Sequence, residues 1–371
     1  MTGSQGGNSQ SGRSTVALRV CEVVVDSGSR RILDEVSFDV SAGETVVVAG
    51  EAGFGGTTLA RVIAGLLQPL RGEILVGGRN IIGAGLTSRQ QVGFVPAGGG
   101  LLPHLTATDN IQYGMRLRRN PNYLRRQRFD DAVSALELRP SLDRRPHDMS
   151  VGQRTRVAIA RLAVRIPRPA VWMVDATGEG QGRGVASLIG RFPGEDPAIV
   201  ICTDVRHPSL TSDAHQLVLV RDGRVVSDAA LITARAELPD LLTARLVLPA
   251  PLPVCAGVVA DDGVECDGIR LPRPAWLSPG ERVSVALPPD ALALAADGQV
   301  PGRVVDVRPE GARSRVLVVP NRVPGDRWLV HCDSVDRPRV RDGCRVRVDP
   351  VRMLVFSTAT GRRIVDQGAT T

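Results

Sequence analysis

A short apolar strand that runs into a glycine-rich loop and then into a helix is the feature that most constrains this fold. Residues 45–49 (TVVVA) are β-branched and continuously apolar, which is typical of a buried strand. They lead into residues 50–58 (GEAGFGGTT), and apolar periodicity predicts a helix from about residue 57 to 67. A strand, a glycine-rich loop and a helix in this order form the setting in which backbone N–H groups bind phosphate.

The residues of this loop only partly suit a phosphate cradle. Its glycines give the backbone the φ freedom that a cradle needs, and Thr57 occupies the position of a hydroxyl that would ligate Mg²⁺. The preceding position, where a phosphate-binding lysine is expected, is Gly56. All 46 basic residues are Arg, so any mechanism that requires Lys is excluded. Considered alone, the loop is better explained as a glycine-rich turn between a strand and a helix.

Length and composition indicate a globular chain of two domains, or three. The chain has 371 residues, 43% hydrophobic and 23% charged, which is enough for more than one core. No apolar run approaches the roughly 18 residues that span a bilayer, so an integral membrane protein is not expected. Residues 1–14 are rich in Gly, Ser, Gln and Asn, which predicts a disordered tail rather than a signal peptide, and a cytoplasmic location.

Charge and cysteine content narrow the range of partners. The net charge is +7, but aromatic residues make up only 3% and the arginines are spread along the chain, so no nucleic-acid partner is expected. The densest arginine run, at 116–128, is interpreted as a solvated helix face rather than a binding patch. The six cysteines lie far apart without a C-x-x-C pair, which favours reduced thiols over disulfides or a zinc site.

Strands and helices alternate along the first 235 residues, and the composition then changes. This alternation predicts an α/β fold with a parallel sheet and crossover helices. Beyond residue 235, short alternating runs such as 303–307 and 345–348, with turn signals every 8 to 12 residues or so, predict a small all-β barrel. The predicted strands lie at 16–25, 32–40, 45–49, 170–174, 198–202 and 217–220, and helix-forming segments lie at about 109–137 and 152–164.

Several segments stand in the order and spacing of a known family. They are 33–38 (LDEVSF), Pro69 with 72–74 (GEI), 92–95 (VGFV), 103–106 (PHLT) with 110–111 (NI), 149–153 (MSVGQ), 156–161 (RVAIAR) and Asp175. In these markers the chain resembles the ATP-binding subunits of ABC transporters, in particular the importer type with a C-terminal TOBE-like domain. The resemblance implies a P-loop NTPase-like ABC domain over 15–235, with a helical subdomain at about 98–165, and an OB/TOBE-like β-barrel domain over 236–371.

The same resemblance assigns the site residues position by position. It implies nucleotide binding by Gly50, Gly53, Gly55, Gly56, Thr57, Thr58 and Asp175, and Mg²⁺ binding by Thr57 and Asp175. Ser150, Gly152 and Gln153 correspond to the family's signature segment, in which Val151 replaces a glycine. In the family's head-to-tail dimer, this segment faces the P-loop of the partner.

Most residues that handle ATP in the family are replaced here. The adenine-stacking aromatic residue corresponds to Val25, the phosphate-binding lysine to Gly56, and the glutamine that couples the metal to the permease to Ala97. The catalytic glutamate corresponds to Ala176. The switch histidine corresponds to Asp204, whose carboxylate would repel a γ-phosphate.

Two further family positions are not matched by clear counterparts. His207 lies three residues beyond the position of the switch histidine, and only a shift of the loop would move it to that position. The aspartate of the family's dimer-contact loop cannot be identified within 178–182 (GEGQG). No residue is therefore assigned a catalytic role, and weak or absent binding of ATP and Mg²⁺ is predicted.

Two functions of different classes follow. The first is the nucleotide-binding subunit of an ABC import system, in which the chain's own ATPase site is impaired. Such a subunit would dock on integral-membrane permease subunits, peripherally on the inner face of the cell membrane. It would pair with a second ABC ATPase, or with its own copy, and complete the partner's ATP site in trans. The second is a soluble regulatory or sequestering scaffold unrelated to active transport.

Overall fold

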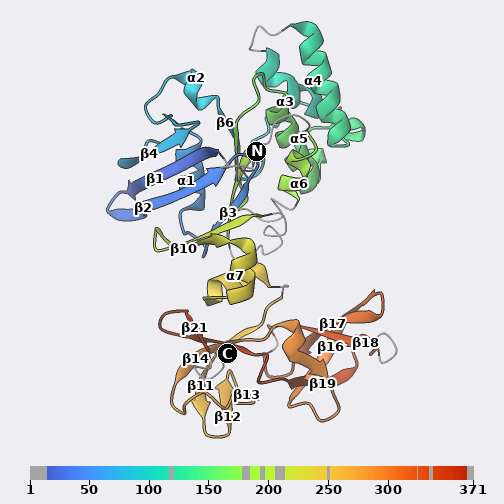
Figure 1. Ribbon diagram of the computed structural model, residues 1–371. Helices are drawn as coiled ribbons and strands as arrows, with labels where there is room; N and C mark the ends of the chain where they lie inside the picture. Colours follow the sequence, from blue (N-terminus) through green and yellow to red (C-terminus); the bar gives the residue numbers. More distant parts are fainter. Residues whose placement is uncertain are drawn as a thin grey trace, which may run out of the picture. The chain divides into compact units, whose positions relative to one another are not determined.

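The computed structural model describes residues 15–116, 121–177, 184–192, 197–204, 214–248, 251–323, 325–333 and 337–365 (Figure 1). The predicted tail at 1–14 lies outside these residues. Contacts within the chain form two units, Met1–Leu231 and Ile232–Thr371, and each is described by itself. The domain boundary at 235/236 stays a prediction. None of the helices in the described ranges is long and apolar enough to cross a membrane.

The first unit is built around a six-stranded sheet of order β10-β9-β3-β8-β7-β6. All neighbouring strands from β9 to β6 run parallel, and β10 pairs antiparallel with β9 at one edge. Every residue of β3, β7 and β8 is buried, which agrees with their apolar sequences. The predicted parallel sheet is thereby confirmed. Its strands are β3 (Thr45–Gly50), β6 (Val92–Val95), β7 (Val171–Asp175), β8 (Ala198–Asp204), β9 (Gln216–Arg221) and β10 (Arg224–Ala230).

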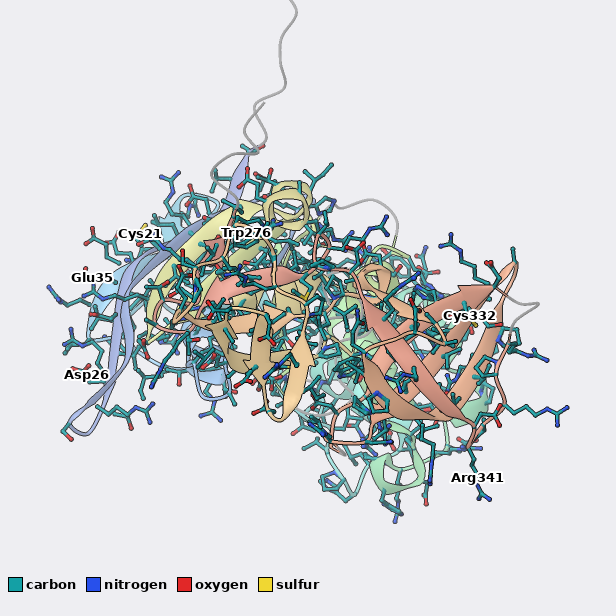
Figure 2. All side chains as sticks on the ribbon, turned by 90° about the horizontal axis from the view of Figure 1, so that it is seen from below. Cys21, Asp26, Glu35, Trp276, Cys332 and Arg341 are labelled. Atoms are coloured by element: carbon teal, nitrogen blue, oxygen red, sulfur yellow. The ribbon has the colours of Figure 1, made fainter. Side chains whose placement is uncertain are left out.

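A second, antiparallel sheet forms from the first strands of the chain, in the order β2-β1-β4-β5. β1 and β2 are joined by a tight turn in which Gly28 has a φ of +61°. The strands predicted at 16–25 and 32–40 are present, but the alternation of strands and helices did not predict this separate sheet. The strands are β1 (Val16–Ser27), β2 (Arg30–Ser41), β4 (Arg71–Val76) and β5 (Arg79–Asn80). The half-buried thiol of Cys21 lies on β1 (Figure 2).

Helix α1 (Gly56–Ile63) follows β3 and packs against β7 and β8. Its buried residues Leu59, Val62 and Ile63 join the core that the two sheets share. The helix was predicted to continue to about residue 67. It ends earlier because Gly65, with a φ of +67°, adopts the left-handed conformation that typically follows a helix.

The helical part of the first unit lies between β6 and β7 in the sequence (Figure 1). The helix-forming segment predicted at 109–137 is divided into two helices, because α4 begins directly after Pro121, whose ψ of 139° is extended. The predicted helix at 152–164 is confirmed as α5. The elements between β6 and β7 are α3 (Ala107–Arg116), α4 (Asn122–Ala135), α5 (Val151–Ala163) and the 3₁₀ turns Arg139–Ser141 and Pro146–Asp148. Two short helices lie outside this part, α2 (Leu86–Arg89) before β6 and α6 (Val185–Ile189) after β7.

The second unit is all β apart from short helices. One sheet has the order β13-β12-β11-β14-β20-β21 and the other β15-β19-β16-β17-β18. The edge strands β15 and β18 of the second sheet lie side by side, so this sheet is nearly closed. Trp328 lies fully buried in the core of the unit. The predicted all-β barrel-like domain is confirmed.

The elements of the second unit follow in sequence order. Near its start are α7 (Leu231–Glu237) and α8 (Leu241–Val247), and a 3₁₀ turn at Pro289–Ala291 precedes β15. Its strands are β11 (Val254–Ala260), β12 (Gly263–Cys266), β13 (Ile269–Leu271), β14 (Arg282–Ala286), β15 (Leu292–Leu294), β16 (Val300–Glu310), β17 (Arg313–Pro320), β18 (Trp328–Asp333), β19 (Gly343–Val348), β20 (Leu354–Ser357) and β21 (Arg363–Ile364).

Candidate functional site

The glycine-rich loop connects the carboxyl end of β3 to the first turn of α1. Gly53 and Gly55 have φ angles of +85° and +98°, in the left-handed region that favours glycine. A Cβ atom on Gly55 would also lie 2.9 Å from Leu33 Cδ2. Gly55 is the residue before α1, and no described side chain caps this helix. The backbone N–H groups of the first turn therefore face the loop, as in a phosphate cradle.

A hollow of about 380 Å³ lies over this loop. Most of the predicted nucleotide-binding residues line it, while Gly50 and Asp175 lie at the ends of the strands beneath. The β3–β8 register pairs Gly50 with Asp204, so the sheet brings the carboxyl ends of β3, β7 and β8 together. The lining residues are Ile32, Ala52, Gly53, Phe54, Gly55, Gly56, Thr57, Thr58, Thr177 and Asp204.

The two residues predicted to hold Mg²⁺, Thr57 and Asp175, are connected through Thr177. Thr177 Oγ1 donates a hydrogen bond to Asp175 Oδ1 at 2.7 Å, and the Thr177 backbone N–H donates to the same oxygen at 3.2 Å. Because the single hydroxyl proton of Thr177 is used there, Thr57 Oγ1 is the donor in its 3.1 Å contact with Thr177 Oγ1. Asp175 is only 1% exposed. Thr177 thus takes part in the site, although the sequence analysis did not identify it.

Ala176 and Asp204, which the resemblance matches to the family's catalytic glutamate and switch histidine, lie at the carboxyl ends of the adjacent strands β7 and β8. Ala176 is fully buried, and its backbone N–H donates to the Cys202 carbonyl oxygen at 2.8 Å. Asp204, which the resemblance matches to the switch histidine, ends β8 and lines the hollow. Burial, and secondly the charge of Asp175, raise the pKa of the Cys202 thiol well above its ordinary value. His207 and the loop at 178–182 lie outside the described residues.

Ala97, which the resemblance matches to the family's coupling glutamine, precedes three consecutive glycines, and α5 is hydrogen-bonded to the second and third of them. Gly98, Gly99 and Gly100 have φ angles of +81°, +78° and +56°. Arg161 of α5 donates from Nη1 to the Gly100 carbonyl oxygen at 2.7 Å and from Nη2 to that of Gly99 at 3.0 Å. Burial lowers the pKa of Arg161. The arginine therefore connects this loop directly to the helix that follows the signature segment.

Asn110 organises the loop that contains 103–106 (PHLT). Its Nδ2 donates to the carbonyl oxygens of Leu102, Leu105 and Thr106 at 3.0 to 3.2 Å, and its Oδ1 accepts from the Leu102 backbone N–H at 2.8 Å. The Asn110 side chain is fully buried. This residue, noted in the sequence only as a family marker, is therefore a structural one that holds the exposed Pro103 and His104 in place.

The signature segment, residues 150–153, forms the start of α5. Ser150 Oγ accepts from the Gln153 backbone N–H at 3.2 Å, and Gln153 Oε1 accepts from the Ser150 backbone N–H at 2.9 Å, so the two residues form a capping box. Gln153 Nε2 also donates to Ser141 Oγ at 3.1 Å. Ser150 and Gly152 are exposed, and beyond its chain neighbours and the backbone of its own helix, no described atom lies within 4 Å of a Cβ atom built on Gly152. The three predicted signature residues thus lie together at an exposed helix N-terminus.

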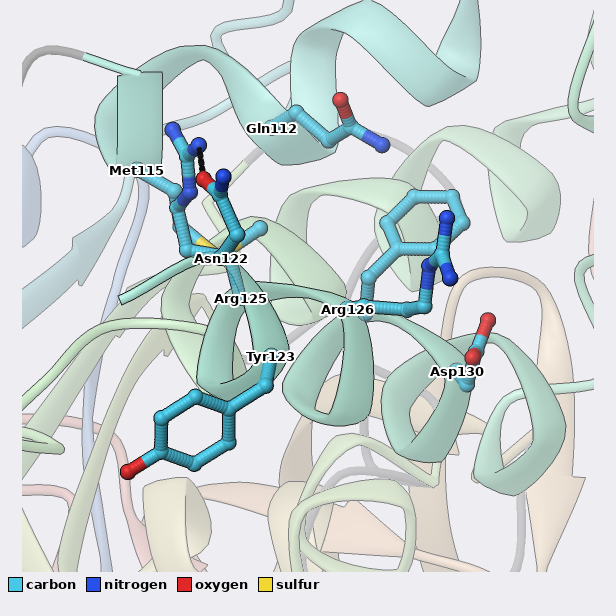
Figure 3. Close-up of a pocket in the computed structure, with 8 residues that line it drawn as sticks. Gln112, Met115, Asn122, Tyr123, Arg125, Arg126 and Asp130 are labelled. Carbon is cyan, nitrogen blue, oxygen red and sulfur yellow. Dashed lines mark hydrogen bonds between the residues drawn. The ribbon is translucent and has the colours of Figure 1, made fainter. Parts of the chain in front are cut away.

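A second hollow, of about 800 Å³, lies in the helical part, between residues of α3 and α4 (Figure 3). Gln112 and Met115 line it from α3, and Tyr123, 73% exposed, and Arg126 line it from α4. Arg125, which also lines it, donates from Nη2 to Asn122 Oδ1. The hollow contains none of the predicted nucleotide-binding residues. Among the described residues, no group of three His, Cys, Asp or Glu side chains could hold a metal ion.

Comparisons with known proteins show which family and fold this chain resembles. Residues 33–177 match the family model described as ABC transporter. The chain is 29% identical over 350 residues to the Fe(3+) ions import ATP-binding protein FbpC of Pseudomonas fluorescens, covering 90% of this chain and 95% of that protein. It is 27% identical over 353 residues to the sn-glycerol-3-phosphate import ATP-binding protein UgpC of Yersinia pseudotuberculosis, covering 91% and 96%. A solved structure of an ATP-binding subunit of an ABC transporter covers 60% of this chain and 93% of its own, at 21% identity and a TM-score of 0.50, which is a similarity of fold.

Proposed function

Because the chain belongs to the importer-type ATP-binding subunits of ABC transporters, we propose that it is the subunit of an import system that does not hydrolyse ATP at its own site. It docks on membrane permease subunits at the inner face of the cell membrane. It dimerises with a second ABC ATPase and completes that partner's ATP site with its signature segment. The contrast between a largely retained signature segment, in which only Val151 departs from the family pattern, and a more strongly altered phosphate loop carries this proposal.

The chemistry of the loop supports the loss of hydrolysis. Gly56 provides no cation for the phosphates, and a charge-assisted contact of this kind contributes about 1.5–3 kcal/mol. Ala176 cannot act as a general base, a role that is typically worth about 10²- to 10⁴-fold in rate. Asp204 adds a carboxylate to the wall of the hollow, and this negative charge opposes a triphosphate.

The arrangement around Asp175 does not fit a metal ion held in the family's way. A metal ligated by both Thr57 and Asp175 needs their oxygens free to face it, but Thr177 Oγ1 lies between them and is bonded to both. Asp175 and Thr57 are therefore satisfied without a cation. This supports weak or absent binding of Mg²⁺, and of ATP, at this chain's own loop.

The signature segment retains what a partner's site would need. In the family's dimer the serine and the helix N-terminus point at the γ-phosphate bound by the partner. Here Ser150 and Gly152 are exposed at the N-terminus of α5, and the Gln153 capping box fixes the backbone around them. Ser150 and Gln153 would also be needed simply to cap α5. A test therefore has to separate helix capping from contact with the partner's nucleotide.

Gly152→Ala separates them. The new methyl group has open space within this chain, and alanine is favoured over glycine in a helix, so the fold is preserved. In an assembled dimer the same methyl group would crowd the partner's phosphate. Gly114→Ala in α3 is the matched control, because it is also a helical glycine with no described atom within 4 Å of its added Cβ atom.

The experiment is an ATPase measurement on the complex recovered by gentle affinity purification of this chain from its native membranes. We expect permease subunits and a second ATPase to co-purify, and Gly152→Ala to lower turnover at least 10-fold while Gly114→Ala leaves it unchanged. Unchanged turnover with Gly152→Ala contradicts completion in trans. Recovery of permeases without a second ATPase replaces the heterodimer with a homodimer. Recovery of neither favours the soluble scaffold.

A further inference from the structure

Phe54, the residue in the middle of the glycine-rich loop, turns its side chain inward. Its side chain is only 8% exposed and belongs to the core shared by the two sheets of the first unit. A Cβ atom built on Gly50 would lie 2.5 Å from Phe54 Cγ, and one built on Gly56 would lie 2.5 Å from Phe54 Cζ. The ring therefore extends from the first glycine of the loop to the first residue of α1.

Position 50 also has no space for a side chain. A Cβ atom on Gly50 would lie 2.6 Å from Phe54 Cβ and 2.5 Å from the Val220 carbonyl oxygen, so the base of the phenylalanine packs directly against this glycine. At the other end, a Cβ atom on Gly56 would lie 3.1 Å from Thr177 Cγ2. Any side chain at position 56, lysine included, overlaps the ring as it is packed.

We propose that Phe54 and Gly56 form one specificity-determining pair. The ring occupies the space from which a phosphate-binding side chain at position 56 would extend, and it places an apolar surface inside the cradle. The two departures from a phosphate loop, a large residue at 54 and no cation at 56, are thus a single change. The pair, rather than Gly56 alone, excludes a nucleoside triphosphate; this step rests on the proposed function, in which the loop is a former phosphate cradle.

Phe54 also lines a second, smaller hollow next to the loop, of about 240 Å³. Three arginines, Arg30, Arg31 and Arg221, line it together with the acidic residues Glu51 and Asp222. The ring thus borders both hollows. A smaller residue at 54 would widen the space over the loop towards these arginines.

The first test measures stability and needs no ligand. In the full-length chain, Gly56→Ala should lower the Tm by about 2–12 °C because its methyl group meets the ring. In a Phe54→Ala background the same substitution should lower the Tm much less, because only the 3.1 Å approach to Thr177 Cγ2 remains and alanine is favoured over glycine in a helix. Gly114→Ala, the control, should behave alike in both backgrounds. Equal effects of Gly56→Ala in the two backgrounds would overturn the pair.

The second test measures binding of Mg²⁺-ATP by fluorescence titration of a labelled analogue. Gly56→Lys alone should change the Kd less than about 2-fold. Phe54→Ser/Gly56→Lys should bind about 10- to 150-fold more tightly than Phe54→Ser, the range of a charge-assisted hydrogen bond. Tight binding by Gly56→Lys alone, or no gain in a folded double variant, would overturn the role of the pair in specificity. Neither test uses a permease or a partner ATPase. Both results can therefore be interpreted even if the ATPase measurement on the complex contradicts the transport role.

Discussion

Replacing Thr177 by valine tests whether its hydroxyl group holds the buried carboxylate of Asp175. Valine has nearly the same shape as threonine and replaces the hydroxyl group with a methyl group, which can neither donate nor accept a hydrogen bond. The 2.7 Å bond to Asp175 Oδ1 is lost, together with the contact to Thr57, while the 3.2 Å bond from the backbone N–H remains. Asp175 is 1% exposed, so water cannot replace the lost donor.

The expected cost follows from the charge of the acceptor. A hydrogen bond to a charged group contributes about 1.5–3 kcal/mol, and a neutral one about 0.5–1.5 kcal/mol. We therefore expect Thr177→Val to destabilise the first unit by about 1.5–3 kcal/mol, a shift of about 3–12 °C in Tm for a unit of this size. Thr108→Val is the control, because the half-buried Thr108 donates at 3.1 Å to a neutral acceptor, the Leu142 carbonyl oxygen.

The assay has to follow the first unit separately. Cys202 is buried in this unit and Cys255 in the other, so alkylation of each thiol at increasing urea concentration, quantified by mass spectrometry, gives each unit its own unfolding transition. The Cys202 transition should move to lower urea in Thr177→Val, further than in Thr108→Val, and the Cys255 transition should stay. Equal shifts of the Cys202 transition in the two variants would show that Thr177 does not hold the carboxylate.

Three further predictions concern charge, thiols and the loop at 103–106. The hydrogen bond from Arg31, and secondly that from Arg224, hold the pKa of Asp34 below its ordinary value of 3.8, so the stability that Asp34 contributes should be complete above about pH 4 and lost as the pH falls through the native pKa. In Asp34→Asn, the urea midpoint of unfolding should therefore depend less on pH over that acid range. Iodoacetamide at pH 8 should modify the half-buried thiols of Cys21, Cys332 and Cys344, the first two of which are labelled in Figure 2. It should spare the buried thiols of Cys202, Cys255 and Cys266, because burial raises the pKa of the last two to about 12. Modification of Cys202 in the native protein, read by mass spectrometry, would contradict its burial. Asn110→Ala should destabilise the first unit by about 2–4 kcal/mol, because the Leu102 N–H and three carbonyl oxygens lose a buried partner. A decrease of less than about 0.5 kcal/mol in the free energy of unfolding, measured in urea, would be incompatible with that network.

The sequence predicted those features that depend on local periodicity. Residues 45–49 are apolar at every position, and the structure buries them as a strand at the centre of a parallel sheet. Because the carboxyl ends of parallel strands meet at one edge, placing the loop at 50–58 and Asp175 near each other needed only the order of the strands. The helix predicted at 152–164 is present as α5, and the capping pattern at its start, a serine followed three residues later by glutamine, was a local signal that the prediction did not use.

Other features depend on contacts between distant residues and have no local signal. Thr177 meets Thr57 across 120 positions, and nothing in the residues around either one indicates the contact. Phe54 resembled an ordinary loop residue until its ring was placed between Gly50 and Gly56. The separate antiparallel sheet was also missed, because the pairing of β1 with β4 joins residues about 50 positions apart.

The contact between Phe54 and Gly56 also sets the order in which mutations can restore a phosphate loop. A lineage that carries this pair gains nothing from lysine at 56 while the ring is in place, and that step also lowers stability. Loss of the ring first removes buried apolar surface without supplying a cation. Each single step is therefore unfavourable by itself, and only the two together are selectable. The pair therefore resists reversal by single mutations, and descendants of this chain are expected to keep an aromatic residue at 54 together with glycine at 56.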